Sequence, residues 1–199
     1  MSNGYQDTIV EQTDLYTIAT STELGPAIPY KSLVHEDGRV NHGFTDYREH
    51  PELVDEIPEA AGKPGLLALL HILNDHNSVL MSLGCENDLF DAEFSTVDGP
   101  AVYIGGYIDV GYRDAALATE AKLLALSVAI MAHRKPLTEE WTKYELIVQP
   151  MKHFFGKAAH NLQLKILAYG PDAPKAWANF NAQCAEMAKT FERLSKTDC

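Results

Sequence analysis

The chain has 199 residues, of which 46% are apolar and 22% charged, a composition that excludes wholesale disorder and predicts a single domain spanning residues 1–199. Its formal net charge of −12 opposes contact with phosphates, so we expect no direct binding to nucleic acid.

Acidic side chains are concentrated in the first part of the chain. Residues 1–114 hold 20 acidic and 5 basic side chains, whereas residues 115–199 hold 8 acidic and 11 basic ones. Two interpretations follow. The acidic part packs against the mildly basic part, which is the simpler interpretation, or it forms an acidic surface that attracts a basic protein partner.

Several features predict a reduced, cytoplasmic location. Residues 1–14 contain neither the basic nor the apolar segment of a secretory signal. The cysteines are odd in number and form no CxxC motif; they are Cys85, Cys184 and Cys199. The apolar stretch 115–132 is nearly long enough to cross a bilayer, but it contains two charged residues and many alanines, so we expect no membrane span.

Residues 1–62 are predicted to form an acidic front region rich in loops and strands. Within it, residues 15–21 (LYTIATS) are β-branched and aromatic, which favours a strand. The pair Asp37-Gly38 supplies a residue that tolerates positive φ, and this predicts a first β-hairpin. A cluster of Pro and Gly separates this region from residues 63–199, which are predicted to hold the main helical core.

The main region is predicted to begin with a helix over residues 65–83. Its apolar-face positions recur at spacings of three and four: Leu66, Leu69, Leu73, His76, Leu80 and Leu83. A second hairpin is then expected from residues 90–97 and 101–112. In its second arm Gly105-Gly106 marks a bulge or a close approach of another backbone.

The stretch 115–132 is the most apolar of the chain, with fourteen apolar residues in eighteen. We expect a helix that is capped by Asp114 and buried by its neighbours. A row of alanines is predicted to let another helix approach closely: Ala118, Ala121, Ala125, Ala129 and Ala132. A polar line recurs every seven residues and is expected to face solvent or line a cleft: Arg113, Glu120, Ser127 and Arg134.

Two further helices are expected after this stretch. The first begins at Thr138, continues to about Ile166 and is kinked or split in two by Pro150. The second begins near Asp172 and carries a packing stripe at spacings of three and four: Trp177, Phe180, Cys184, Met187, Phe191 and Leu194. The resulting prediction is an α+β fold, a mainly helical core of four or five helices around residues 115–132 with two β-hairpins at one side.

His76 and Glu120 are the candidate catalytic residues. His76 occupies an apolar-face position of the predicted helix, where an imidazole needs a hydrogen-bond partner. Glu120 is a carboxylate in the most apolar stretch and needs a partner if it is buried. A His76–Glu120 pair would perturb the pKa of both groups, as happens at many functional sites. The alternative is a satisfied core histidine and a glutamate at the surface.

Other candidate groups are weaker. His153 and His160 lie seven residues apart and would share a helix face, but that face is expected to be exposed, so no metal site is predicted. Cys184 belongs to a packing stripe, and Cys85 lies beside Glu86, which raises the pKa of the thiol, so neither is expected to act as a nucleophile.

Two classes of function are compatible with these patterns. The first is a cytoplasmic acidic binding protein that neutralises a basic protein partner. The alternative is a small-molecule or metal-dependent enzyme with a pocket between core helices, using His76, Glu120 and Tyr103 or Tyr107. The sequence contains no motif that names a cofactor or substrate, and a homo-oligomer stays open.

Overall fold

The computed structural model describes residues 7–34, 36, 38, 40–92, 100–137 and 141–195. Its centre is a seven-stranded mixed sheet in the order β1-β2-β8-β9-β7-β6, with β3 paired to the far end of β8. The strands of this sheet are β1 (Thr8–Gln12), β2 (Tyr16–Thr20), β3 (Gly25–Ile28), β6 (Leu80–Asp91), β7 (Val102–Tyr112), β8 (Thr142–Phe154) and β9 (His160–Gly170). Strands β4 (Leu33–Val34) and β5 (Val40–Asn41) form a separate small hairpin.

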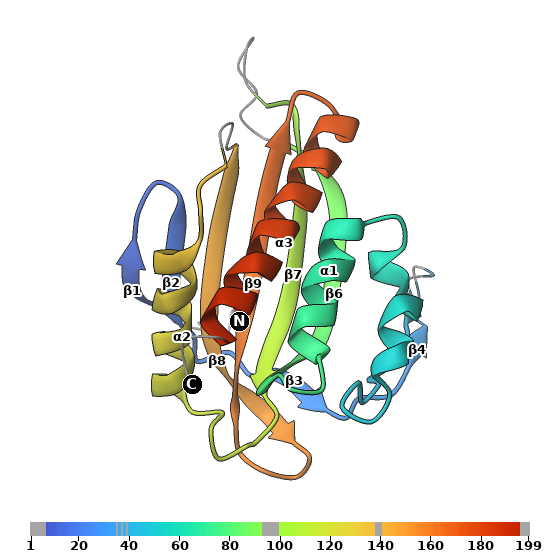
Figure 1. Ribbon diagram of the computed structural model, residues 1–199, viewed down its shortest axis with the longest axis vertical. Helices are drawn as coiled ribbons and strands as arrows, with labels where there is room; N and C mark the ends of the chain where they lie inside the picture. The colour runs from blue at the N-terminus through green and yellow to red at the C-terminus, as the bar shows by residue number, and fades with distance from the viewer. Residues whose placement is uncertain are drawn as a thin grey trace.

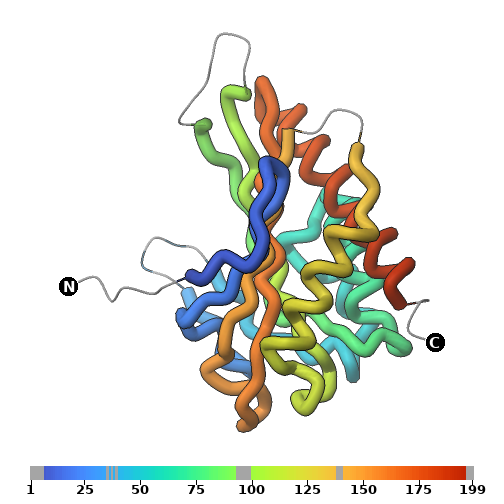
Figure 2. Tube along the Cα trace, turned by 90° about the vertical axis from the view of Figure 1, so that its left-hand side faces the viewer, coloured from blue at the N-terminus to red at the C-terminus, as the bar shows by residue number. Residues whose placement is uncertain are grey.

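Three helices cover one face of this sheet (Figures 1 and 2): α1 (Pro64–Asn74), α2 (Glu120–His133) and α3 (Ala173–Ser195). The main core lies between them and the sheet, because alternate residues of each central strand point toward the helices. On β9 these inward residues are Leu162, Leu164, Ile166 and Ala168, all fully buried. The 3-10 helices η1 (Pro51–Glu56) and η2 (Pro58–Ala60) lie beside α1 at the β6 side of the sheet (Figure 1).

The predicted mainly helical core is therefore wrong. Strand accounts for about 38% of the structure and helix for about 32%. The largest error concerns residues 138–166. Residues 138–140 lie outside the described part, but β8 and β9 stand where one kinked helix was predicted. Their turn contains Phe155 and Gly156 with φ of 49° and 77°, the positive values that a tight two-residue hairpin turn requires.

The stretch 115–132 is not the centre of the core. Helix α2 begins only at Glu120, and its N-cap is Thr119, whose side chain accepts a hydrogen bond from the Lys122 N–H. Within α2 only Leu123, Ser127 and Ile130 are buried. The predicted packing row of alanines is largely exposed, since Ala121, Ala125 and Ala132 face solvent. Among the described residues, no helix is long and apolar enough to cross a membrane.

The predicted helix over residues 65–83 is too long. Helix α1 ends at Asn74, a run of turn-forming residues follows, and β6 begins at Leu80. The second arm of the second hairpin is confirmed as β7, but its partner strand is β6, Leu80–Asp91, which overlaps the predicted first arm only at residues 90 and 91. Residues 93–99 of that predicted arm and its turn lie outside the described part. At Gly106 a side chain rather than another backbone comes close: a Cβ there would lie 2.6 Å from the ring of Phe180.

Three other predictions are confirmed. The strand predicted over residues 15–21 is β2, and the first predicted hairpin is β4 with β5, although Asp37 lies outside the described part. The last helix is α3, whose buried side includes Phe180, Cys184 and Met187 of the predicted stripe. This helix lies across the strands and supplies the longest cover of the sheet (Figure 1).

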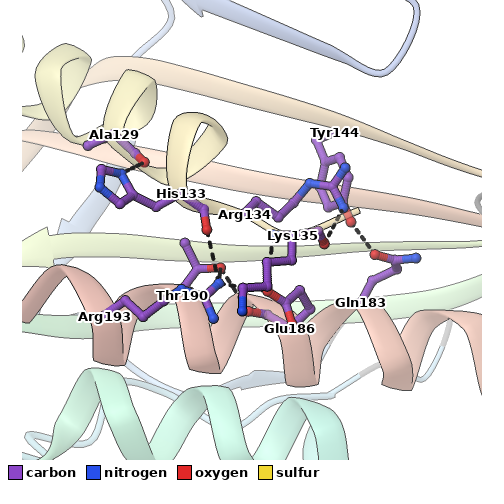
Figure 3. Close-up of polar contacts among 9 residues, drawn as sticks. All are labelled: Ala129, His133, Arg134, Lys135, Tyr144, Gln183, Glu186, Thr190 and Arg193. Atoms are coloured by element: carbon purple, nitrogen blue, oxygen red, sulfur yellow. Dashed lines mark hydrogen bonds and ion pairs between the residues drawn. The ribbon is translucent and has the colours of Figure 1, made fainter. Parts of the chain in front are cut away.

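A buried polar network joins the end of α2 to α3 and β8 (Figure 3). The Glu186 carboxylate, 4% exposed, accepts hydrogen bonds from the Arg193 guanidinium at 2.6 Å and from the Lys135 backbone N–H at 3.1 Å. Arg193 also donates to the His133 carbonyl at 3.0 Å. These contacts satisfy carbonyl and amide groups that the end of α2 leaves open.

The same network contains the last residue of the predicted polar line. Arg134 is 8% exposed and its guanidinium lies 4.8 Å from the centre of the Tyr144 ring. The Tyr144 hydroxyl in turn donates a hydrogen bond to Gln183 on α3. With Ser127 also buried, two of the four residues in this line face the core, so the line is neither a solvent-facing seam nor a cleft lining.

Candidate functional site

The second face of the sheet carries the polar side chains. On β7, Tyr107 and Asp109 point away from the helices, because Ile104, Ile108 and Val110 point toward them. The neighbouring outward positions on β9 are Lys165 beside Tyr107 and Gln163 beside Asp109. Described residues of the segment 25–60 pass over part of this face, and β3 anchors the segment by pairing with β8. Its last part, η1 and η2, contributes to the main core.

A second apolar cluster fixes residues 25–60 to this face. Ile28 of β3 is fully buried against Met81 and Leu83 of β6 and against Met151 and Phe154 of β8. This cluster is separate from the main core and leaves a space between the covering segment and the sheet.

That space is a cavity of about 990 Å³, at the large end of the range for small-molecule sites. Its floor is formed by Asp109 and Tyr107 of β7 together with Ser82–Asp88 of β6. Tyr30 and Tyr47 from the covering segment form its other side. Charged side chains of both signs line it, and the acidic ones outnumber the lysines among the described residues: Glu56, Glu59, Glu86, Asp88 and Asp109 against Lys31 and Lys152.

Asp109 is the most perturbed carboxyl group of this cavity. It is 7% exposed, and its Oδ1 accepts a hydrogen bond from Asn161 Nδ2 at 2.8 Å and a longer one from Gln163 Nε2 at 3.4 Å. Burial raises the pKa of Asp109 to about 7, although the amides of Gln163 and Asn161 and the charge of Lys165 act against burial. Asp109 therefore changes its charge near neutral pH.

Two phenols lie beside Asp109. Tyr30 donates a hydrogen bond to the Leu83 carbonyl at 3.3 Å, and burial together with nearby negative charge raises its pKa to about 12. Tyr107 donates to Glu86 at 3.4 Å, and burial, then Asp109 and Glu86, raise its pKa as well. Both phenols stay protonated at neutral pH and can donate one hydrogen bond and accept others.

The thiol of Cys85 also lines the cavity and is not a nucleophile. Burial, followed by the charges of Glu59 and Asp109, raises its pKa to about 12. The direction agrees with the sequence-based expectation, but burial rather than Glu86 is the main cause. The thiolate needed for nucleophilic attack is therefore scarce at neutral pH.

The structure does not bring the predicted catalytic residues together. His76 lies in the turn between α1 and β6, its side chain is 77% exposed, and it pairs with Asp75 at 3.6 Å. Glu120 is 57% exposed at the start of α2 and lies 3.9 Å from His160. The predicted His76–Glu120 pair is absent, because the helix that was to bury His76 ends at Asn74.

The other histidines are dispersed. His153 bonds the Ile28 carbonyl at 3.0 Å, and His71 pairs with Asp55 at 2.8 Å. Within the described ranges, no group of three His, Cys, Asp or Glu side chains is placed to hold a metal ion.

The chain has no match among protein-family models, among curated proteins or among solved structures. The site must therefore be judged on its own chemistry. Of its residues, only Tyr107 was among the candidates from sequence. Asp109 was missed, although its position on the polar side of an alternating strand was visible, since nothing in the sequence shows that residues 25–60 cover it.

Proposed function

We propose that this protein is a binding protein for organic cations, and that the cavity over Asp109 receives a primary amine or guanidinium group. The observation that carries the proposal is the buried Asp109 carboxyl in a cavity whose described walls hold more carboxylates than lysines. The cationic group belongs either to a free small molecule or to a Lys or Arg side chain of a basic protein partner. A reduced, cytoplasmic setting is part of this proposal, supported by the free thiols of Cys85 and Cys184.

Charge and ring chemistry both support a cation. A carboxylate held in a largely desolvated site attracts an ammonium group far more strongly than one in water. Tyr30, Tyr47 and Tyr107 also line the cavity, and an aromatic ring that turns its face to a cation adds quadrupole attraction. The uneven distribution of charge along the chain also supports a cation. Residues 1–114 are the acidic part, and every acidic residue among the described cavity lining belongs to them.

A second candidate function is general acid–base catalysis in the same cavity. The pKa of Asp109 near 7 is the range in which a carboxyl group can both give and take a proton at neutral pH. This would make the protein an enzyme acting on a small molecule, with Asp109 in place of His76 and Glu120. Turnover of a bound amine, observed as loss of the added compound, would favour this candidate over simple binding.

The proposal is tested by calorimetric titration of the full chain at about pH 8 with spermidine, with a pentalysine peptide and with uncharged 1,4-butanediol. We expect the cations to bind and the diol not to bind. Spermidine alone would identify a small-molecule site, whereas pentalysine alone would identify a basic protein partner. Equal binding of the diol, or binding of none of the three, would contradict the proposal.

Two matched variants locate the binding. Glu59→Gln removes a carboxylate from the cavity wall, so we expect affinity to fall about tenfold at low salt, a loss of roughly 1.4 kcal/mol. Glu52→Gln removes the same charge from the exposed side of η1, outside the cavity lining, and should leave affinity nearly unchanged. Equal losses in both would indicate attraction by overall charge rather than a site.

A further inference from the structure

Asn161 is buried on the polar face of the sheet, directly behind Asp109. It is 0% exposed, and its Nδ2 donates the 2.8 Å hydrogen bond to Asp109 Oδ1. Its own Oδ1 is buried and has no hydrogen-bond partner among the described residues. A Cβ on Gly25 would lie 2.5 Å from this oxygen, so the glycine of β3 is what leaves room for the amide.

Stability alone does not account for an asparagine at this position. A buried acceptor without a partner destabilises a fold, and an apolar residue of similar size would avoid that cost. The adjacent inward residue Leu162 shows that this strand is otherwise built from aliphatic side chains where it is buried. Polar groups that are kept at a cost to stability mark sites of function.

We propose that Asn161 is the positioning residue of the cation site: its amide holds the Asp109 carboxylate in place and favours the charged form that a cation requires. This inference rests on the proposed function. Because the amide offers an N–H to Asp109, it stabilises the carboxylate more than the neutral acid. Without it, Asp109 would carry its charge only at higher pH, and the cavity would bind cations only there.

Other groups around Asp109 also act on its charge. Gln163 on β9 donates to the same oxygen over a longer distance of 3.4 Å and favours the carboxylate as well. Lys165 on the same strand also favours the carboxylate and is paired with Glu145 at 3.3 Å. Burial is the effect that opposes ionisation of Asp109. Tyr107 and Glu86 lie across β7 and β6, and Glu59 of η2 also lines the cavity. The remaining charged side chains among the described residues that line the cavity are Lys31, Glu56, Asp88 and Lys152.

The test compares the wild type with Asn161→Leu, which keeps the size of the side chain and removes the donor, and with Gln163→Leu. The ionisation of Asp109 is followed by its side-chain carboxyl carbon signal in NMR between about pH 4 and pH 10, and spermidine affinity is measured over the same range. For Asn161→Leu we expect the titration midpoint to rise by roughly one pH unit or more. Spermidine affinity should fall about tenfold near pH 7 and recover near pH 9–10. Gln163→Leu removes the longer hydrogen bond to the same oxygen and should raise the midpoint as well. A larger rise for Gln163→Leu than for Asn161→Leu would assign the positioning role to Gln163 and overturn the inference.

The outcomes separate the two proposals. Suppose that spermidine binds the wild type and that Asn161→Leu lowers the affinity for spermidine by the same factor at every pH. Asn161 is then only structural, and the inference is overturned. If spermidine binds at no pH, the proposed function fails, while the NMR midpoint still decides whether Asn161 controls Asp109. Should Asn161→Leu not fold, Asn161→Ala, which removes the same donor without adding an apolar side chain, takes its place in the NMR titration. A midpoint for Asp109 equal to that of the wild type would overturn the inference.

Discussion

Arg193 and Glu186 lie seven residues apart on α3, and their side chains meet at 2.6 Å beside the end of α2. Arg193 also reaches the His133 carbonyl, so this pair fastens α2 to α3. Burial raises the pKa of Glu186, but hydrogen bonds from Arg193 and the Lys135 N–H lower it more, and the group stays charged. Removing the cation would leave a buried carboxylate without its main partner.

We therefore expect Arg193→Ala to lower the free energy of unfolding by roughly 2–3 kcal/mol in urea denaturation at neutral pH. Lys189→Ala is the matched control, since it removes an exposed cation from the same helix and should change stability by less than about 0.5 kcal/mol. Equal effects of the two substitutions would mean that the pair contributes only as surface charge.

The crossing of α1 and α3 depends on Gly65. A Cβ at this position would lie 1.9 Å from the backbone oxygen of Asn181, which has no room to move within α3. Gly65→Ala should favour the helix by about 1 kcal/mol through its propensity, so any loss of stability comes from the clash. We expect a net loss of roughly 2 kcal/mol or more in thermal or urea denaturation. Ala68→Ser, at an exposed position of α1, should change little.

The thiol of Cys85 should be protected in the folded protein. With its pKa at about 12, the thiolate is roughly a thousandfold rarer near pH 8 than for an ordinary cysteine. We expect iodoacetamide to label Cys85 at least a hundredfold faster in urea than in buffer, as measured by peptide mass spectrometry. Rapid labelling of the folded chain would show that a thiolate forms in the cavity and would revise the description of its electrostatics.

The elements predicted well from the sequence are those in which the spacing of apolar residues fits only one type of secondary structure. The stripe from Trp177 to Leu194 repeats over five steps and fits only a helix, and α3 follows it. Residues 15–21 are β-branched and become β2. In β7 the two-residue alternation is visible in the sequence and separates its apolar side from the outward side that carries Tyr107 and Asp109.

The errors arose where apolar residues are dense enough to fit two periods. In β8, Tyr144, Leu146 and Val148 alternate as in a strand. Trp141, Tyr144, Val148 and Met151 also follow the spacing of a helix, and this second pattern predicts a helix here. Leu80 and Leu83 likewise extended the stripe of α1 through the turn that contains His76. Strand pairing of β8 with β2, β3 and β9 decides between the periods, and such contacts are distant in sequence.

The cavity could not be predicted for the same reason. Its central residue, Asp109, is buried only because β3 pairs with β8 and carries residues 25–60 over the sheet. From the sequence, Asp109 is one more polar residue on an outward face. Glu120 attracted attention because its neighbours are apolar in sequence, yet it begins a helix at the surface.

Asp109 should make stability depend on pH in a direction unusual for a carboxyl group. Its pKa is raised from 3.8 to about 7, so the folded state holds the proton more tightly than the unfolded state. The contribution of this tighter proton binding to the free energy of unfolding is fully present below about pH 4. It is lost as the pH rises to about 7, which lowers the free energy of unfolding by an amount on the order of 4 kcal/mol.

Asp109→Asn keeps the shape of the side chain without the charge and should remove this decrease. The stability of the variant relative to wild type, measured by urea denaturation, should therefore rise between about pH 4 and pH 7 and stay constant above. Asp114→Asn, at an exposed position just after the same strand, is the control and should show no such rise. A constant difference between Asp109→Asn and wild type over this range would mean that Asp109 ionises at its ordinary pKa, and the cavity would then bind cations without linkage to protons.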